Sequence, residues 1–121
     1  MATGSVFDVR EALDRIQTLH GSFMASGITY SGQTSVDITL PERAAFSDYA
    51  PLLVICTYRV PNASDKDGIA VIKYVANTAV IAYKAGANAL TGIAYDAATK
   101  VLTLSCESYI TFIVIGRLRA G

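Results

Sequence analysis

The stretch SVDITL, residues 35–40, alternates polar and apolar side chains and decides the fold class. Val36, Ile38 and Leu40 fall on one face of an extended strand, because successive side chains of a strand point to opposite faces. Pro41 ends the alternation. The stretch therefore predicts a strand with one buried face and one wet face, as is common in antiparallel sheets.

Seven further segments are short, rich in strand-forming residues and bounded by turns or prolines. They are residues 28–31, 52–60, 69–75, 79–84, 92–95, 100–106 and 109–118. No strand–helix–strand alternation occurs, which disfavours a parallel sheet. The chain is therefore predicted to be mainly β, an antiparallel β-sandwich of about eight strands in two four-stranded sheets with jelly-roll-like wiring. Residues 42–51 are predicted to be a connection with one helical turn.

Two of these segments, residues 52–60 and 109–118, are apolar on both faces and are predicted to be central strands or interface strands. The chain has 52% hydrophobic and only 17% charged residues, against roughly a quarter charged in typical domains. Exposed apolar surface of this extent is normally covered. We therefore expect a homo-oligomer, with Tyr109, Ile113 and Ile115 in the subunit interface.

A short helix is predicted from Val6 to His20, ahead of the strands. Ser5 can cap its first turn, and Gly21 can end it in a left-handed conformation. The chain is accordingly divided into an N-terminal helical stub, residues 1–26, and a β-sandwich domain, residues 27–121.

The apolar residues of this helix recur at steps of three and four, and the pattern runs on to Phe23. The members within the helix are Val6, Val9, Leu13, Ile16 and His20. Such a seam either joins neighbouring chains in the oligomer, which is the interface we expect, or packs on the sandwich of its own chain. In a joined seam, copies of His20 would converge on the symmetry axis and could bind an ion or respond to pH. The plainer interpretation is a histidine favoured at a helix C-terminus by the helix dipole.

Composition argues against several partners. The formal net charge is zero and no cluster of basic residues is present, which disfavours nucleic acid. The apolar runs are only as long as strands, so no membrane partner is expected, and the N-terminus has no signal-peptide pattern. Cys56 and Cys106 lie in apolar strand patterns and are predicted to be buried and reduced, with a disulfide between facing strands as the alternative.

Catalytic motifs are also missing from the sequence. His20 is the only histidine, and neither a nucleophile elbow nor a phosphate-binding glycine loop is present. We therefore expect no enzymatic activity, no metal and no cofactor, although catalytic residues assembled across subunits stay open as an alternative. A second alternative is a carbohydrate-binding or host-surface-binding module, because the chain has seven tyrosines and tyrosine suits contact surfaces.

The segment VREALDRIQTL, residues 9–19, followed by the hairpin AYDAATKVLTLS, residues 94–105, resembles in layout the small bacteriophage virion proteins of the tail fibre, head fibre or capsid decoration type. The resemblance implies a homotrimer located in the virion. It also implies that the partners are other virion proteins on a capsid or tail, or a host surface glycan.

Overall fold

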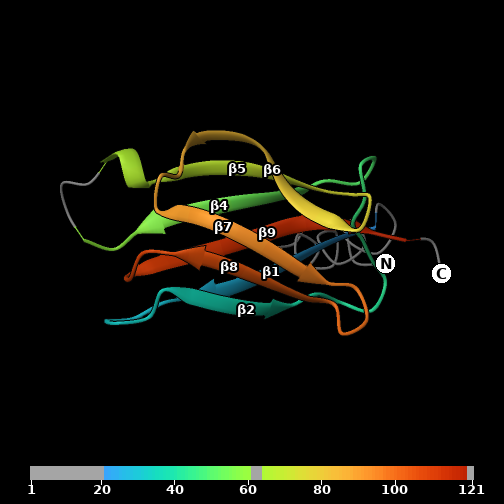
Figure 1. Ribbon diagram of the computed structural model, residues 1–121, viewed down its shortest axis with the longest axis horizontal. Helices are drawn as coiled ribbons and strands as arrows, with labels where there is room; N and C mark the ends of the chain where they lie inside the picture. The colour runs from blue at the N-terminus through green and yellow to red at the C-terminus, as the bar shows by residue number, and fades with distance from the viewer. Residues whose placement is uncertain (1–20, 61–63, 120–121) are drawn as a thin grey trace, which may run out of the picture.

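The computed structural model describes residues 21–60 and 64–119, which form two antiparallel sheets packed face to face (Figure 1). The larger sheet has the strand order β1–β9–β4–β5–β6, with β3 pairing to β9, and the smaller sheet has the order β2–β8–β7. The strands are β1 (Ser22–Ile28), β2 (Ser35–Thr39), β3 (Ala44–Ala45), β4 (Leu52–Tyr58), β5 (Gly68–Val75), β6 (Thr78–Gly86), β7 (Leu90–Asp96), β8 (Val101–Cys106) and β9 (Ile110–Leu118). The prediction of a mainly β, antiparallel, two-sheet architecture is confirmed.

One apolar core lies between the two sheets. Every second residue of β4, β8 and β9 is buried, as the period of two requires. The largest side chains with no exposed surface come from both sheets: Leu52, Ile72, Leu90, Leu102, Leu104, Ile110 and Phe112. Cys56 and Cys106 belong to the same core and are free thiols, as predicted. Burial raises the pKa of the Cys56 thiol to about 11 and also raises the pKa of Cys106.

The order of the strands differs from a jelly roll. β6 contacts β7 and β1 contacts β2 where the two sheets meet. Consequently the five strands β4 to β8 follow one another around the sandwich as a meander, whereas a jelly roll contains two interlocked Greek keys. Tight turns between consecutive strands explain why strands that follow one another in the chain lie next to one another in the sandwich. Ala76 and Asn77, between β5 and β6, both have positive φ (51° and 63°), as expected of a type I′ hairpin turn.

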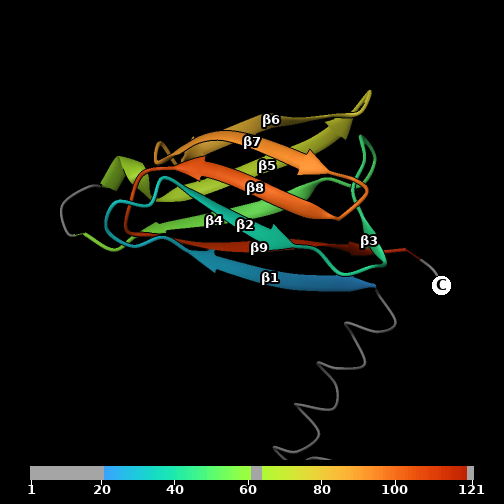
Figure 2. The same ribbon diagram turned by 60° about the horizontal axis from the view of Figure 1, so that its bottom comes forward.

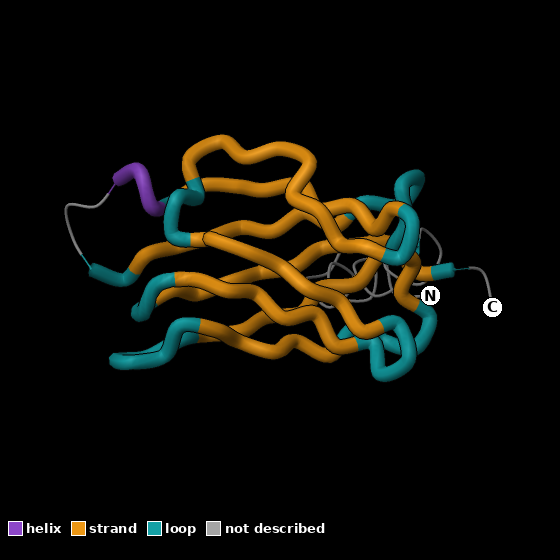
Figure 3. Tube along the Cα trace, viewed as in Figure 1, coloured by secondary structure: helices purple, strands orange, loops and turns teal. Residues whose placement is uncertain are grey.

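The two sheets are also unequal, with six and three strands, where the sequence predicted four and four. The connection at residues 42–51 contains the two-residue strand β3 and bends, in place of the predicted helical turn. The single helical element among the described residues is the 3₁₀ turn η1 (Ser64–Lys66), drawn purple in Figure 3, and it lies at the end of the sandwich away from β3 (Figure 2).

The predicted boundary between stub and sandwich needs a correction. β1 begins at Ser22, so residues 22–26 are part of the large sheet, and the strand predicted at residues 28–31 starts six residues earlier. Phe23, which continued the helical seam in the sequence pattern, is buried in the core at 7% exposure. The strand pairs along its length with β9, which gives these residues a partner that short-range periodicity does not reveal (Figure 2). The helix predicted from Val6 to His20 lies outside the described residues.

Candidate functional site

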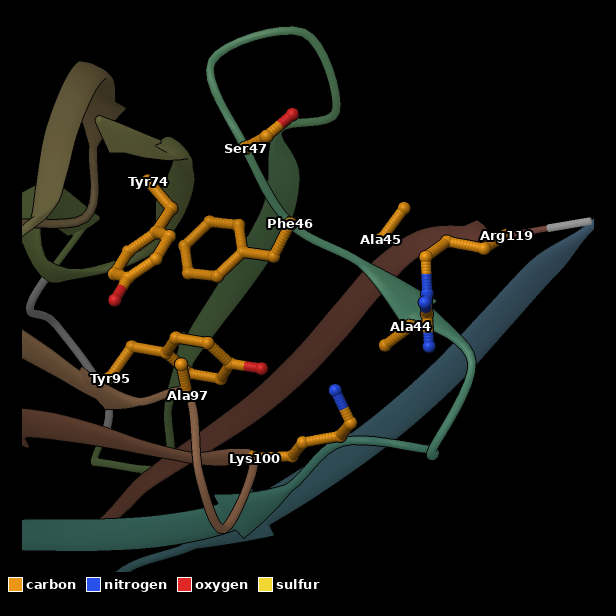
Figure 4. A pocket seen from close by; sticks show the side chains of 9 residues that line it. All are labelled: Ala44, Ala45, Phe46, Ser47, Tyr74, Tyr95, Ala97, Lys100 and Arg119. Atoms are coloured by element: carbon orange, nitrogen blue, oxygen red, sulfur yellow. The ribbon is translucent and has the colours of Figure 1, made fainter. Parts of the chain in front are cut away.

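A pocket of about 400 Å³ opens between the two sheets at the end of the sandwich where β9 ends. Its volume falls within the range of small-molecule sites, roughly 300–1,000 Å³. Residues from four separate parts of the chain line it: Ala44, Ala45, Phe46, Ser47, Tyr74, Tyr95, Ala97, Lys100 and Arg119 (Figure 4). Below, this set is called the end pocket.

Three half-buried aromatic rings form one wall of the end pocket. Phe46 stacks on Tyr74 with ring centroids 5.4 Å apart and an interplanar angle of 27°. Tyr95 meets Phe46 edge-on at 5.0 Å and Tyr74 edge-on at 5.2 Å. Each pair has a geometry that the ring quadrupoles favour, so the wall is a mutually supported cluster.

The loop that follows β3 places Phe46 in this cluster. Ser47 and Ala50 exchange backbone hydrogen bonds of 3.1 and 3.3 Å, and the Ser47 hydroxyl accepts a hydrogen bond of 3.1 Å from the Tyr49 backbone N–H. Asp48 pairs with Lys73 of β5 at 3.4 Å. These contacts hold the loop against β5, one residue from Tyr74, and so bring Phe46 over that ring.

A hairpin turn places Lys100 on the opposite wall. Lys100 has a φ of 60°, and its backbone N–H donates to the Asp96 carbonyl at 2.7 Å. The Asp96 carboxylate accepts the Ala98 N–H at 2.9 Å, a local bond typical of aspartate in turns. The turn directs the Lys100 side chain toward the pocket and leaves the Asp96 carboxylate engaged with backbone amides (Figure 4).

Arg119 supplies the second cation. Its guanidinium donates to the Glu42 carbonyl at 3.0 Å, and its own carbonyl accepts two hydrogen bonds from the Arg43 guanidinium, at 3.0 and 2.6 Å. The Arg119 backbone N–H donates to the Arg43 carbonyl at 2.6 Å. Arg119 is thus fixed beside β3 by backbone groups, and its charge faces the pocket without a carboxylate partner among the described residues.

The end pocket is therefore cationic. Lys100 and Arg119 line it, and no carboxylate side chain of the described residues does. Burial raises the pKa of the Tyr95 hydroxyl, Tyr74 and Asp96 raise it further, and Arg119 opposes them. The Tyr95 hydroxyl consequently stays protonated at neutral pH and can both donate and accept a hydrogen bond.

A second surface feature is the outer face of the large sheet, which points away from the core. Side chains on this face line up across strands in two rows that follow the pairing register. The first row is Met24, Ile115, Leu53, Val71 and Tyr83, and the second is Ser26, Ile113, Ile55, Ile69 and Ala85. Below, these two rows are called the outer face.

The outer face has no charged residue in either row, and no element within residues 21–60 and 64–119 packs on it. Met24 (63% exposed) and Tyr83 (58%) lie at the two ends of the first row, and Ile69 of the second row is 38% exposed. The residues between Met24 and Tyr83 are half-buried, so the two rows form one uncharged apolar surface across the sheet. Arg117 and Lys73 lie at the margins, beyond the rows. β4 and β9 are central strands, and their outward residues make the middle of this apolar surface, as the sequence predicted for strands that are apolar on both faces.

The structure places three of the eight predicted interface residues. Ile113 and Ile115 lie on the outer face. Tyr109 precedes β9 with a φ of 67°, is 39% exposed, and lies under the Arg59 guanidinium, 6.0 Å from its ring centroid. Tyr109 therefore lies just before the start of β9, apart from Ile113 and Ile115. The other five, Val6, Val9, Leu13, Ile16 and His20, lie outside the described residues.

Sequence patterns did not identify the end pocket. Tyr74 and Tyr95 belonged to a set of tyrosines with no assigned site, and Phe46 lay in a connection without periodicity. Arg119 stands two residues after Arg117, and two arginines near a strand end are no basic cluster and gave no signal of a binding site. The one usable signal was the DAATK turn, residues 96–100, because it predicts that a lysine follows a tight hairpin loop.

No metal site is evident in the part of the chain that the structure describes: no three His, Cys, Asp or Glu side chains gather there. None of its helical segments has the length and apolarity to cross a membrane. Comparison with known proteins does not assign the chain to a family, because no protein-family model, no curated protein and no solved structure matches it.

Proposed function

We propose that the chain is a non-enzymatic structural subunit of a bacteriophage virion that forms a symmetric homo-oligomer through the outer face. The observation that carries the assembly part is the pair of uncharged rows across five strands, with Met24 and Tyr83 more than half exposed. Removing apolar surface from water is worth roughly 25 cal/mol per Å². In a symmetric assembly the outer faces of the subunits converge on the symmetry axis, so that copies of the same apolar surface cover one another.

The virion part of the proposal rests on layout. A sandwich that follows an N-terminal segment with a heptad-like seam resembles phage fibre and decoration proteins, and in that case the oligomer is a trimer that docks on a capsid or tail. In such a trimer, seam residues such as Leu13 also join the subunits.

Light scattering coupled to size exclusion tests the assembly. The wild-type chain should run as an oligomer at micromolar concentration. Ile113→Asp should run as a monomer with an unchanged far-UV circular dichroism spectrum, because its carboxylate would otherwise be buried without a partner. Thr39→Asp is the control, since it adds the same charge at an exposed position of the small sheet. A wild-type monomer, or an Ile113→Asp oligomer of unchanged mass, contradicts the proposal.

The virion assignment has its own test. Particles purified from the source of the gene should contain the chain at a fixed copy number that is a multiple of the measured oligomer. Absence of the chain from such particles contradicts the assignment and leaves the assembly result standing.

A further inference from the structure

We propose that the end pocket binds an acidic sugar, a pyranose ring that carries a carboxylate. The assignment is independent of assembly, because every residue of the end pocket comes from one chain and none belongs to the outer face. Three properties of the pocket point to this class of ligand: its charge, its aromatic wall and the hydroxyl group of Tyr95.

Charge selects an anion. Lys100 and Arg119 line the pocket from two separate elements, and neither forms an ion pair with an acid of the described residues. Two nearby acids are engaged elsewhere, Asp48 with Lys73 and Asp96 with the amides of its turn. Glu42 contacts Arg119 through its backbone carbonyl. A ligand carboxylate would therefore find two uncompensated cations, and arginine suits carboxylates because its N–H groups form a planar fork.

The aromatic wall selects a ligand with an apolar face. Phe46, Tyr74 and Tyr95 support one another in a fixed cluster, so the wall requires little ordering when a ligand arrives. Inorganic anions such as phosphate have no apolar face to place against these rings. A pyranose ring presents C–H groups on its face, and aromatic side chains offer an amphipathic contact surface.

A hydroxyl group favours a sugar over an aromatic acid. The Tyr95 hydroxyl points toward Lys100 across the pocket, and it can both donate and accept a hydrogen bond (Figure 4). Sugar hydroxyls need partners of both kinds, whereas an aromatic acid leaves this group unmatched. The volume of about 400 Å³ is sufficient for a single sugar unit with bridging water.

Titration of the wild-type chain with sodium glucuronate, followed by ¹H–¹⁵N correlation spectra, tests the proposal. Saturable shifts should centre on Phe46, Tyr95, Ala97 and Lys100. Glucose should bind about tenfold more weakly, because it lacks the carboxylate. Acetate should also bind at least tenfold more weakly, because it lacks the ring. Equal responses to acetate, phosphate and glucuronate would mean that the pocket is only a cationic patch and would overturn the proposal. Tighter binding of benzoate than of glucuronate would assign the pocket to aromatic acids and would also overturn it.

Variants locate the binding. Lys100→Gln and Arg119→Gln should each weaken glucuronate binding by roughly five- to tenfold. Arg117→Gln is the matched control, because Arg117 is an exposed arginine two residues from Arg119 that does not line the pocket. Spectra of each variant without ligand establish that it is folded. Equal affinity of wild type and both pocket variants would show that glucuronate binds elsewhere and would refute the assignment.

Discussion

Ile55 of β4 lies directly opposite Ile113 of β9, and both side chains project from the outer face of the large sheet. Cross-strand neighbours on one face interact by roughly 0.2–1 kcal/mol. The pair therefore contributes to the sheet within one chain and, if the outer face is an interface, to contacts between chains. These two contributions can be separated by charge substitution.

The double variant Ile55→Lys/Ile113→Glu should keep the sheet and lose the assembly. Opposite charges on directly paired positions support each other, so the melting temperature of the double variant should exceed that of Ile113→Glu alone. Association buries both charges against the apolar rows of another subunit, which is unfavourable in either variant. Calorimetry and light scattering on the same samples measure both effects. Restoration of the oligomer in the double variant would contradict an apolar interface at this position.

A single substitution, Leu13→Asp, tests which role the seam of the N-terminal segment has. Leu13→Asp should weaken assembly and leave the melting temperature of the sandwich unchanged if the seam joins chains, because the unpaired carboxylate would then enter a dry interface. If the seam packs on its own sandwich, the same change should lower the melting temperature and preserve the molar mass. Glu11→Asp, a conservative change outside the seam, is the control. No change in either quantity would mean that the seam has neither role.

Thr29 should be a strong determinant of stability although it is polar. It is fully buried, its hydroxyl accepts a hydrogen bond of 2.9 Å from the Ile110 N–H, and it donates to the Glu107 carbonyl at 3.2 Å. Thr29→Val keeps the shape of the side chain and leaves the Ile110 amide without a partner, which costs about 1–3 kcal/mol. Urea unfolding should register this loss, while Thr29→Ser, which keeps the hydroxyl, should lose less. A loss in Thr29→Ser that equals or exceeds the loss in Thr29→Val would show that the methyl group matters at least as much as the hydrogen bonds, and would contradict this prediction.

The buried thiols should make the fold sensitive to alkali. Burial raises the pKa of Cys56 from its ordinary value of 9.0 to about 11. Well below pH 9 the thiol is protonated in both the folded and the unfolded state, and its full contribution to the free energy of unfolding is present. As the pH rises toward 11, the unfolded chain loses the proton first, so stability falls. The melting temperature should therefore decline over this range, and Cys56→Ala should decline less steeply, because the variant lacks this thiol.

Thiol reactivity gives an independent check on Cys56 and Cys106. Both are buried, so a thiol reagent at pH 8 should label neither in the native protein and both after unfolding. Immediate labelling of both native thiols would contradict their burial.

Local signals predicted the parts of the fold that depend on neighbours in sequence. The β7–β8 hairpin follows from the turn at Asp96, and the β5–β6 hairpin follows from the turn near Asn77. Both pairs of strands occur where the sequence placed them. The same reasoning missed all but the last residue of β1, because Phe23 fits the three–four seam and only its pairing with Gly116 on β9 reveals a strand.

The end pocket was beyond sequence reasoning for a related reason. Phe46, Tyr95 and Arg119 meet only because β3 pairs with the end of β9 and the β7–β8 turn lies across from them. Strand order and sheet size depend on such distant pairings, and no periodicity in the chain encodes them. The outer face could be predicted from the sequence, because it follows from a local pattern, two strands that are apolar on both faces.

The central position of β9 sets the order in which the large sheet can be completed during synthesis. β1, made first, and β4, made midway, have no hydrogen bonds to each other and meet only through β9. Until β9 leaves the ribosome, both strands have an open edge, and open edges invite pairing with other chains. At about 5–20 residues per second, the stretch from β4 to β9 takes several seconds to produce. The nascent chain is therefore exposed to misassembly during this interval, and a chaperone that shields β1 and β4 would act in it.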